Sequence, residues 1–230
     1  MPVRCPRMCG RFVSASPASD LARYLDVDEV LAEEHEPSWN VAPTDPVYAV
    51  AERRGQRALG TFKWGLVPSW AKDPSGAARM INARSETLTQ KFGNAFERRR
   101  CLVTADGFYE WDKLPDGTRQ PYYIRRADGA PLTFGGLWEF WRDPRDAARE
   151  LRTCTIITTD ANDLIRPIHD RMPVVLAPSD WARWLDRDNR DVRTIKPLLV
   201  PADPRQFEMY QVSRAVNSIR NNDESLILRQ

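Results

Sequence analysis

The 230-residue sequence has little of what metal centres and disulfide-rich domains require. It holds two histidines, His35 and His169, four cysteines and no Cys-x-x-Cys pair. Cys5 and Cys9 are spaced Cys-x3-Cys, but no second pair follows that could complete a zinc site. We therefore expect no metal and no cofactor, and we expect the cysteines to be thiols rather than disulfides.

Long apolar runs are also missing. No segment approaches the ~18 to 20 consecutive apolar residues of a transmembrane helix. The first residues, Met1 to Arg7, lack the apolar stretch of a secretory signal. These absences predict a protein without membrane association that acts in the cytoplasm.

An excess of one charge is absent as well, because 34 Lys and Arg oppose 32 Asp and Glu, for a net charge of +2. Any binding of nucleic acid must therefore use a local basic patch rather than a uniformly basic surface. Candidate patches are Arg4, Arg7 and Arg11, in a stretch without acids, and the run Arg98-Arg99-Arg100. For the run alone, an ordinary solvated surface is the simpler interpretation.

What is present indicates one globular domain, with 42% hydrophobic residues and eight tryptophans. Helices are expected at 17–25, 85–99, 162–167 and 178–185. Strands are expected at 47–51, 61–64, 101–111 with a break near 106–107, 132–141, 152–159, 172–176 and 207–212. A turn at 115–117 predicts a hairpin of 108–113 with 120–126. This order favours an α+β fold with a mainly antiparallel, barrel-like β core and flanking short helices.

The segment Met8-Cys9-Gly10-Arg11-Phe12 has a cysteine directly after a methionine. If the chain began at Met8, removal of that Met would give Cys9 a free α-amine, which with a pKa of about 8 is partly neutral at pH 7. The amine could attack an aldehyde to form a Schiff base, and the thiol of the same residue could then close a thiazolidine ring. The alternative is a buried structural cysteine.

Two further segments are candidates for contact with nucleic acid. Trp64-Gly65-Leu66-Val67-Pro68-Ser69-Trp70 carries two aromatic rings that could stack on bases; alternatively, both are core tryptophans. Ile81-Asn82-Ala83-Arg84-Ser85-Glu86-Thr87 precedes an expected helix, where Arg84 and backbone N–H groups would suit a phosphate. The alternative there is an ordinary helix cap.

Two more segments contain candidate acids and bases. Glu110 lies among aromatic residues in Asp106-Gly107-Phe108-Tyr109-Glu110-Trp111, where burial would raise its pKa and suit a general acid. Alternatively, it is a surface residue of an edge strand. His169 lies in the loop-like Ile168-His169-Asp170-Arg171-Met172-Pro173, where it could transfer protons or simply hydrogen-bond the loop. His35 is interpreted as a surface residue.

Taken in this order, the five segments resemble the SOS response-associated peptidase (SRAP) family from Met8 to about Val212. Trp39-Asn40-Val41-Ala42-Pro43-Thr44 and Thr133-Phe134-Gly135-Gly136-Leu137-Trp138 add to the resemblance. It implies an abasic-site processing protein that crosslinks to single-stranded DNA through a thiazolidine. It also implies a peptidase, which we interpret as self-removal of the residues ahead of the cysteine, and lyase cleavage when the ring fails to close.

The resemblance also implies roles for individual residues. Cys9 would be the nucleophile, Asn82 would position the reacting groups, Glu110 would help to open the sugar ring, and His169 would assist the Schiff-base chemistry. The implied phosphate-holding arginines are Arg84 and Arg171. Other DNA contacts are predicted at Arg11, Asn40, Trp64, Trp70 and Trp111. Bound to its DNA partner, the protein would be associated with the nucleoid.

Residues 1–7 depart from the family, whose members expose the cysteine directly after the initiator Met. We expect this extension to be absent from or removed in the active form, and residues 8–230 to form the single domain. The alternative function is an N-terminal-nucleophile cysteine amidohydrolase, in which the amine of Cys9 acts as the base. A third is a non-enzymatic single-strand binder that ignores abasic sites. A monomer is expected.

Overall fold

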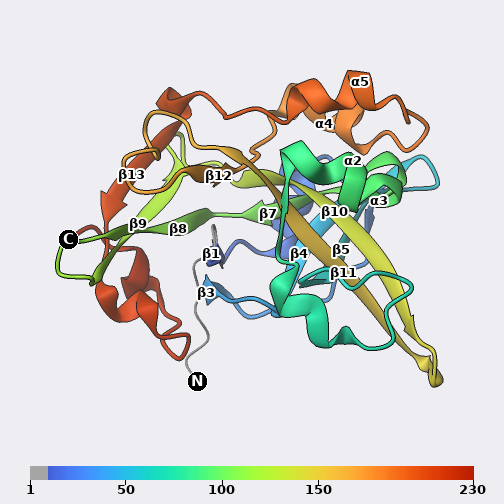
Figure 1. The fold of residues 1–230 in the computed structure, drawn as a ribbon, viewed down its shortest axis with the longest axis horizontal. Coiled ribbons are helices and arrows are strands. Elements are labelled where there is room, and N and C mark those ends of the chain that lie inside the picture. The colour runs from blue at the N-terminus through green and yellow to red at the C-terminus, as the bar shows by residue number, and fades with distance from the viewer. Residues whose placement is uncertain (1–9) are drawn as a thin grey trace.

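The computed structural model describes residues 10–230, in which a β-barrel stands beside a smaller sheet, with short helices outside (Figure 1). The barrel closes because β5 pairs with β4 on one side and with β11 on the other. The ring order is β5–β4–β7–β10–β11–β5. The barrel strands are β4 (Pro46–Arg53), β5 (Gln56–Trp64), β7 (Arg100–Ala105), β10 (Leu132–Asp143) and β11 (Asp146–Asp160).

The barrel strands are antiparallel except where β5 runs parallel to β11, with Cys154 opposite Trp64. The expected α+β class with a mainly antiparallel, barrel-like core is therefore confirmed. Side chains alternate between the two faces of each strand, and the buried inward set on β4 and β7 is Val47, Ala49, Ala51, Cys101, Val103 and Ala105. The outward set, Tyr48, Val50 and Leu102, belongs to a second apolar cluster that helices cover.

The second sheet continues from the barrel, because β8 begins directly after β7 at the expected break near Asp106. Its strand order is β13-β9-β8-β1-β3. The predicted hairpin around residues 115–117 is confirmed, since β8 pairs with β9 from Phe108↔Ile124 to Lys113↔Arg119. These strands are β1 (Phe12–Ser14), β3 (Ser38–Val41), β8 (Gly107–Lys113), β9 (Arg119–Arg126) and β13 (Phe207–Gln211). Short strands added to the barrel sheet are β2 (Glu29–Val30), β6 (Asn82–Arg84) and β12 (Arg171–Pro173).

Two of the four predicted helices are confirmed, as α1 (Ala18–Tyr24) and α4 (Pro178–Leu185). The prediction of a single helix at 85–99 is wrong. The chain leaves helical geometry at Phe92, with φ −131°, and the following Gly93-Asn94 has low helix propensity. The segment forms η2 (Ser85–Thr87), α2 (Leu88–Lys91) and α3 (Gly93–Arg98).

The helix expected at 162–167 is also wrong, because this segment forms consecutive turns. The Asn162 side chain accepts from Ile165 N at 3.1 Å and donates to Ala202 O at 2.9 Å, so it competes with helical hydrogen bonds. The remaining helical turns are η1 (Pro74–Arg79), α5 (Val192–Ile195), η3 (Lys196–Leu198), η4 (Pro204–Gln206), η5 (Arg214–Asn217) and η6 (Glu224–Ile227). No helix in the described part of the chain is both long and apolar enough to cross a membrane.

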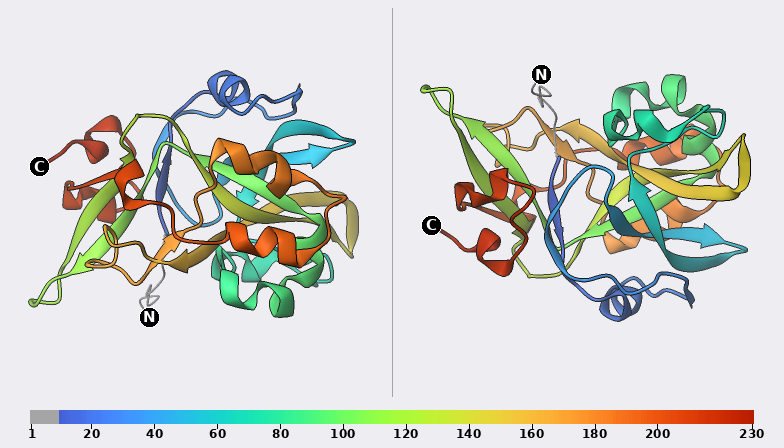
Figure 2. Two further views of the ribbon diagram at one scale, coloured as in Figure 1. Left: turned by 90° about the horizontal axis from the view of Figure 1, so that it is seen from above. Right: turned by 90° about the horizontal axis from the view of Figure 1, so that it is seen from below.

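The C-terminal segment packs beside the second sheet, far from the β10–β11 hairpin, as the views in Figures 1 and 2 agree. Val212, Val216 and Leu226 from this segment are buried with Tyr109 and Tyr123 of β8 and β9. The second sheet is therefore covered on this face, and its other face meets the barrel core through Phe12 and Phe108.

Candidate functional site

Strand β1 fixes the position of the chain that follows the predicted nucleophile. Cys9 itself lies outside the described residues. Phe12 is fully buried and lies opposite Val41 of β3 and Phe108 of β8. Its ring contacts the Trp64 ring edge-on, with centroids 4.9 Å apart. The chain just after Cys9 is thus held at the junction of the barrel and the second sheet.

Glu110 is a buried carboxylic acid on β8, with 3% of its surface exposed. Side chains two residues apart on a strand share a face, so Glu110 is on the face of Phe108, which belongs to the barrel cluster. Tyr109 and Trp111 pack on the other face. The alternative of a surface residue on an edge strand is wrong, since β8 lies between β9 and β1.

Asn82 begins β6, which runs parallel to β11 and has Asn82 opposite Ile156. The preceding carbonyl, of Ile81, accepts a hydrogen bond from Trp64 Nε1 at 3.0 Å. Because the same Trp64 ring contacts Phe12, one tryptophan links the backbone next to Asn82 to the strand that follows Cys9.

His169 has a defined hydrogen bond on one ring nitrogen. Its Nδ1 accepts from the backbone N–H of Arg171 at 3.0 Å, and its side chain is 24% exposed. A neutral imidazole that accepts through Nδ1 carries its proton on Nε2. His169 therefore presents an Nε2–H donor, and its Nδ1 also lies 3.3 Å from Asp170 Oδ1.

Arg171 is buried, and two carboxylates hold its guanidinium. It donates to Glu86 Oε1 at 2.7 Å and to Asp160 Oδ1 at 2.7 Å, and also to the carbonyl of Thr158. Burial lowers the pKa of Arg171, but the bonds to Glu86 and Asp160 outweigh it and raise the pKa. A DNA phosphate at Arg171, which remains a prediction, would have to compete with these carboxylates.

Arg84 differs from Arg171 although both are predicted to hold phosphates. Its side chain is exposed, and no hydrogen bond or ion pair engages its guanidinium within residues 10–230. The long helix expected to follow it is replaced by short turns, so the phosphate site would rest on the Arg84 cation and not on a helix N-terminus.

The described segments that carry predicted catalytic residues converge on one apolar cluster. Ile81 directly precedes Asn82, Phe108 lies two residues before Glu110, and Ile168 directly precedes His169. All three pack in the cluster that also holds Phe12. The catalytic roles of Asn82, Glu110 and His169 remain predictions, but their segments all contact this one cluster.

Two predicted DNA contacts are wrong because the side chains are buried. Trp64 is 0% exposed and is a core residue, as its alternative interpretation held. Asn40 is 4% exposed, and its Nδ2 donates to the carbonyls of Val216, Ser218 and Asn221. Its Oδ1 accepts from Arg11 Nη1 at 2.7 Å. Asn40 therefore organises the protein rather than contacting DNA directly.

Three other predicted DNA contacts are at least partly accessible. Trp70 is 83% exposed. Trp111 is partly buried and its Nε1 donates to Asn217 Oδ1 at 2.7 Å. Arg11 is partly buried and also donates to the carbonyl of Val216 at 3.1 Å. Their roles in binding DNA stay predictions.

Sequence reasoning did not single out Glu86 and Asp160, the two partners of Arg171. Glu86 lay within a quoted segment, and an acid at that point could have suggested a partner for a nearby arginine.

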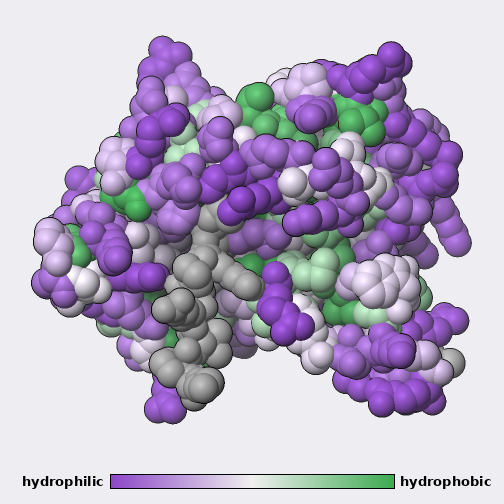
Figure 3. Space-filling view, in the orientation of Figure 1, coloured by the Kyte–Doolittle hydropathy of each residue, from purple (hydrophilic) through white to green (hydrophobic). Residues whose placement is uncertain are grey.

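Figure 3 shows a face made mostly of polar residues with apolar residues exposed near its centre. Within residues 10–230, no group of three or more His, Cys, Asp and Glu side chains could hold a metal ion.

The chain is similar over most of its length to known proteins. The family model described as SOS response associated peptidase (SRAP) matches residues 8–219. Abasic site processing protein YoqW of Bacillus subtilis is 42% identical, over 96% of this chain and 99% of that protein. Abasic site processing protein YedK of Escherichia coli is 32% identical, over 96% and 99%.

Solved structures show the same fold. A Bacteroides thetaiotaomicron protein superposes with a TM-score of 0.85 at 24% identity, covering 96% of this chain and 100% of that one. A phage-related protein from Bordetella bronchiseptica superposes with a TM-score of 0.69 at 30% identity, covering 90% and 95%. The family match extends over most of the chain, and this protein belongs to the SOS response-associated peptidase family.

Proposed function

We propose that this protein processes abasic sites in single-stranded DNA by forming a thiazolidine crosslink through Cys9. The observation that carries the proposal is the burial of Phe12, three residues after Cys9, against Phe108 and Trp64. The described chain reaches this junction through Gly10 and Arg11, so we infer that Cys9 reacts beside the segments of Glu110 and Asn82. Relatives named abasic site processing proteins support the substrate class.

The chemistry requires a carbonyl carbon and two nucleophiles. In the open-chain abasic sugar, the neutral α-amine of Cys9 adds to the C1′ aldehyde, and loss of water leaves a Schiff base. The thiol then adds across the C=N bond, its sulfur to carbon and its proton to nitrogen, which closes a five-membered ring. Both nucleophiles come from one residue, so the second step is intramolecular.

The neighbouring side chains have separate tasks in this scheme. Glu110, buried on β8, protonates the ring oxygen of the closed sugar to expose the aldehyde. His169 donates through Nε2–H to the departing water. Asn82 orients the reacting groups, and the exposed Arg84 binds a flanking phosphate. Without ring closure, the Schiff base would permit β-elimination of the 3′ phosphate, which is the lyase outcome.

The scheme needs a free amine on Cys9, because an amide nitrogen is not nucleophilic. Residues 1–8 must therefore be absent or removed before the crosslink forms. We assign the peptidase activity implied by the family name to this removal, by the protein acting on its own N-terminus.

A denaturing gel tests the proposal. The chain expressed from Met8 should shift single-stranded DNA that carries one abasic site. It should not shift the same strand with a tetrahydrofuran at that position, since this analogue has no aldehyde. Cys9→Ala should abolish the shift, and Glu110→Gln should slow it by about 10²-fold or more. A heat-stable shift with Cys9→Ala would overturn the proposal, whereas ammonia release from glutamine would instead support the amidohydrolase.

A further inference from the structure

The barrel has a second end, away from the end at which β7 continues into β8 and Glu110. Strand β7 leaves the barrel toward Glu110 at Ala105 and begins at the far end with Arg100. Next to that beginning, Ala51 of β4 lies opposite Cys101. No residue assigned to the crosslink lines this far end, although Arg98 of the candidate basic run does.

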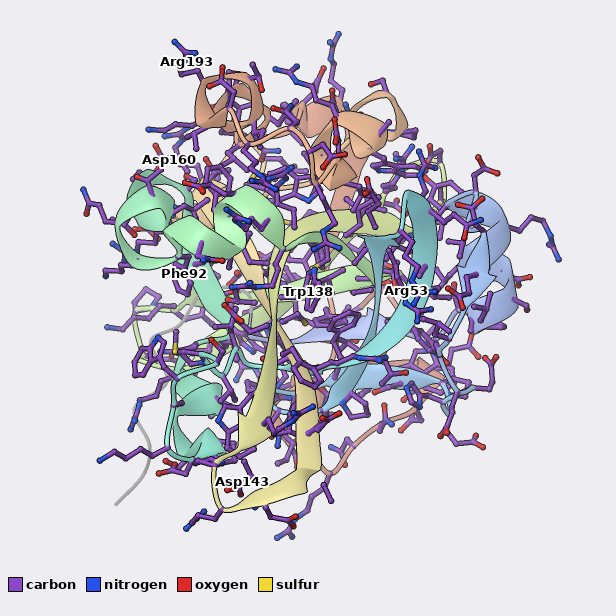
Figure 4. The ribbon with its side chains drawn as sticks, turned by 90° about the vertical axis from the view of Figure 1, so that its right-hand side faces the viewer. Arg53, Phe92, Trp138, Asp143, Asp160 and Arg193 are labelled. Carbon is purple, nitrogen blue, oxygen red and sulfur yellow. The ribbon has the colours of Figure 1, made fainter. Side chains whose placement is uncertain are left out.

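An apolar cavity of about 260 Å³ opens at this far end. We call it the barrel mouth, and its apolar lining includes Leu31, Ala51, Phe62, Trp138 and Phe140. The rings of Phe62 and Trp138 meet edge-on, with centroids 6.1 Å apart. Figure 4 looks at this side of the molecule and shows Trp138 between β10 and the β4–β5 pair. The mouth can therefore take a flat apolar ring.

A polar cavity of about 270 Å³ adjoins the barrel mouth, and Glu52 and Arg187 line both cavities. We call it the arginine pocket. Its four arginines outnumber its two carboxylates, and these charged residues are Arg54, Arg98, Arg187, Arg190, Glu52 and Asp188. In the part of the chain that the structure describes, none of the four arginines forms a side-chain hydrogen bond or ion pair. The pocket therefore has an excess of two positive charges available to an anion.

We propose that the barrel mouth and the arginine pocket together bind a nucleotide, at a site distinct from the crosslinking end. An aromatic base would enter the mouth beside Trp138, since bases stack on aromatic side chains irrespective of sequence. Its phosphate would lie among Arg187 and Arg190, because guanidinium groups bind phosphate in a bidentate manner. A neutral aromatic ligand would not need the arginines, and a simple anion would not need the aromatic lining. A nucleotide uses both, because it carries an aromatic base and a phosphate.

The nucleotide unit has two sources, a free mononucleotide or a second stretch of a DNA strand. Calorimetric titration of the full chain with dAMP, deoxyadenosine, inorganic phosphate and an undamaged dA oligomer separates them. We expect dAMP to bind at least tenfold more tightly than deoxyadenosine or phosphate. If the strand is the source, the oligomer binds instead, and dAMP in excess displaces part of it.

Two variants test the site itself. Arg187→Gln with Arg190→Gln, both exposed positions, should weaken nucleotide binding at least tenfold. Phe140→Ser, at a side chain that is 37% exposed, should weaken dAMP but not phosphate. The matched control is Arg205→Gln, an exposed arginine paired with Asp203 outside both cavities. Circular dichroism melting confirms that each variant is folded.

The proposal is overturned if the double arginine variant binds dAMP and the oligomer as wild type does, or if phosphate alone binds as tightly as dAMP. Formation of the abasic-site crosslink should be unchanged in this variant, since none of the residues assigned to the crosslink lines the arginine pocket. Loss of nucleotide binding with intact crosslinking therefore separates this site from the function proposed for Cys9.

Discussion

The Arg11 guanidinium donates to the side-chain oxygen of Asn40 on β3 at 2.7 Å, and to the carbonyl of Val216 in the C-terminal segment at 3.1 Å. Asn40 completes the junction by donating to the carbonyls of Val216, Ser218 and Asn221. Residues nearly 180 positions apart in the sequence therefore meet two residues from Cys9. The course of the chain from Arg11 into β1 therefore depends on this junction as well as on strand pairing.

Asn40→Ala should lower the free energy of unfolding by about 2–4 kcal/mol, because it leaves several buried carbonyls without a donor. Arg11→Ala should cost about 1–2 kcal/mol and should also slow crosslinking. Urea unfolding measures both. If Asn40→Ala weakened DNA binding while leaving the unfolding free energy unchanged, Asn40 would be a direct DNA contact after all.

Gly107→Ala should destabilise the fold by about 2–3 kcal/mol, as overpacked core positions do. A Cβ at Gly107 would lie 2.4 Å from the Tyr123 ring, and that ring is held by Tyr109 at 5.3 Å between centroids. Thermal unfolding gives the comparison. Gly93→Ala is the matched control, because a Cβ there meets nothing within 4 Å, and it should be neutral or slightly stabilising. Equal melting temperatures for the two variants would contradict this packing.

Arg100→Met should destabilise the fold by about 3–5 kcal/mol, because it leaves buried backbone carbonyls without a hydrogen-bond donor. Arg100 is 2% exposed, and burial lowers its pKa to about 10, so it is still charged at neutral pH. Its guanidinium donates to five backbone carbonyls, those of Phe96, Glu97, Trp184, Asp186 and Asn189.

Chemical denaturation of Arg100→Met beside Arg142→Gln provides the check. Arg142 forms an exposed ion pair with Glu150, and its loss should cost less than about 1 kcal/mol. Similar losses for the two variants would show that the carbonyl cage around Arg100 contributes little.

The pairing of Arg171 with Glu86 predicts a pH dependence of stability. Burial works to raise the pKa of Glu86, but the hydrogen bond and charge of Arg171 outweigh it and lower the pKa below the usual 4.5. The folded state thus binds this proton less readily than the unfolded state, so the contribution is present above about pH 4.5 and is lost as the pH falls through the lower folded pKa.

The free energy of unfolding should be measured from about pH 3, below the usual carboxylate pKa, to about pH 7. At neutral pH, the wild type should be more stable than Glu86→Gln. The difference should shrink below about pH 4. Glu86 is half exposed, so the effect is modest. A difference that grew toward acid pH would have the wrong sign for this pair.

Cys101 and Cys154 should resist alkylation in the folded protein. Both are fully buried, and burial raises the pKa of each thiol well above its usual value. Labelling with iodoacetamide followed by peptide mass spectrometry should modify neither in buffer and both in urea. Modification of Cys154 at the rate of an exposed thiol would contradict the closed barrel.

Local signals in the sequence predicted much of the fold. Pro115-Asp116-Gly117 identified the β8–β9 hairpin, and the pattern from Pro178 to Leu185 identified α4 with the same bounds. The helix predictions failed in two places. At Asn162 the side chain competes for the hydrogen bonds of a helix, and at Gly93 a glycine interrupts the helical spacing of apolar residues. The parallel β5–β11 pairing that closes the barrel joins distant strands, and neither strand carries a local mark of it.

The candidate site shows the same division. The resemblance selected segments that share one apolar cluster, and of the two interpretations of Glu110 the structure supports the buried one. Within one motif, however, Trp64 is a core residue while Trp70 is 83% exposed. Residue type alone cannot separate them, because burial depends on which strand covers which ring. The carboxylate partners of Arg171 likewise come from two other elements.

The most direct test of the central claim is intact mass spectrometry of the protein before and after incubation with single-stranded DNA that carries one abasic site. The account predicts a mature mass that begins at Cys9 and a heat-stable adduct of one strand, with the loss of one water, that Cys9→Ala abolishes. No adduct from protein whose mass confirms a free Cys9 amine would contradict it.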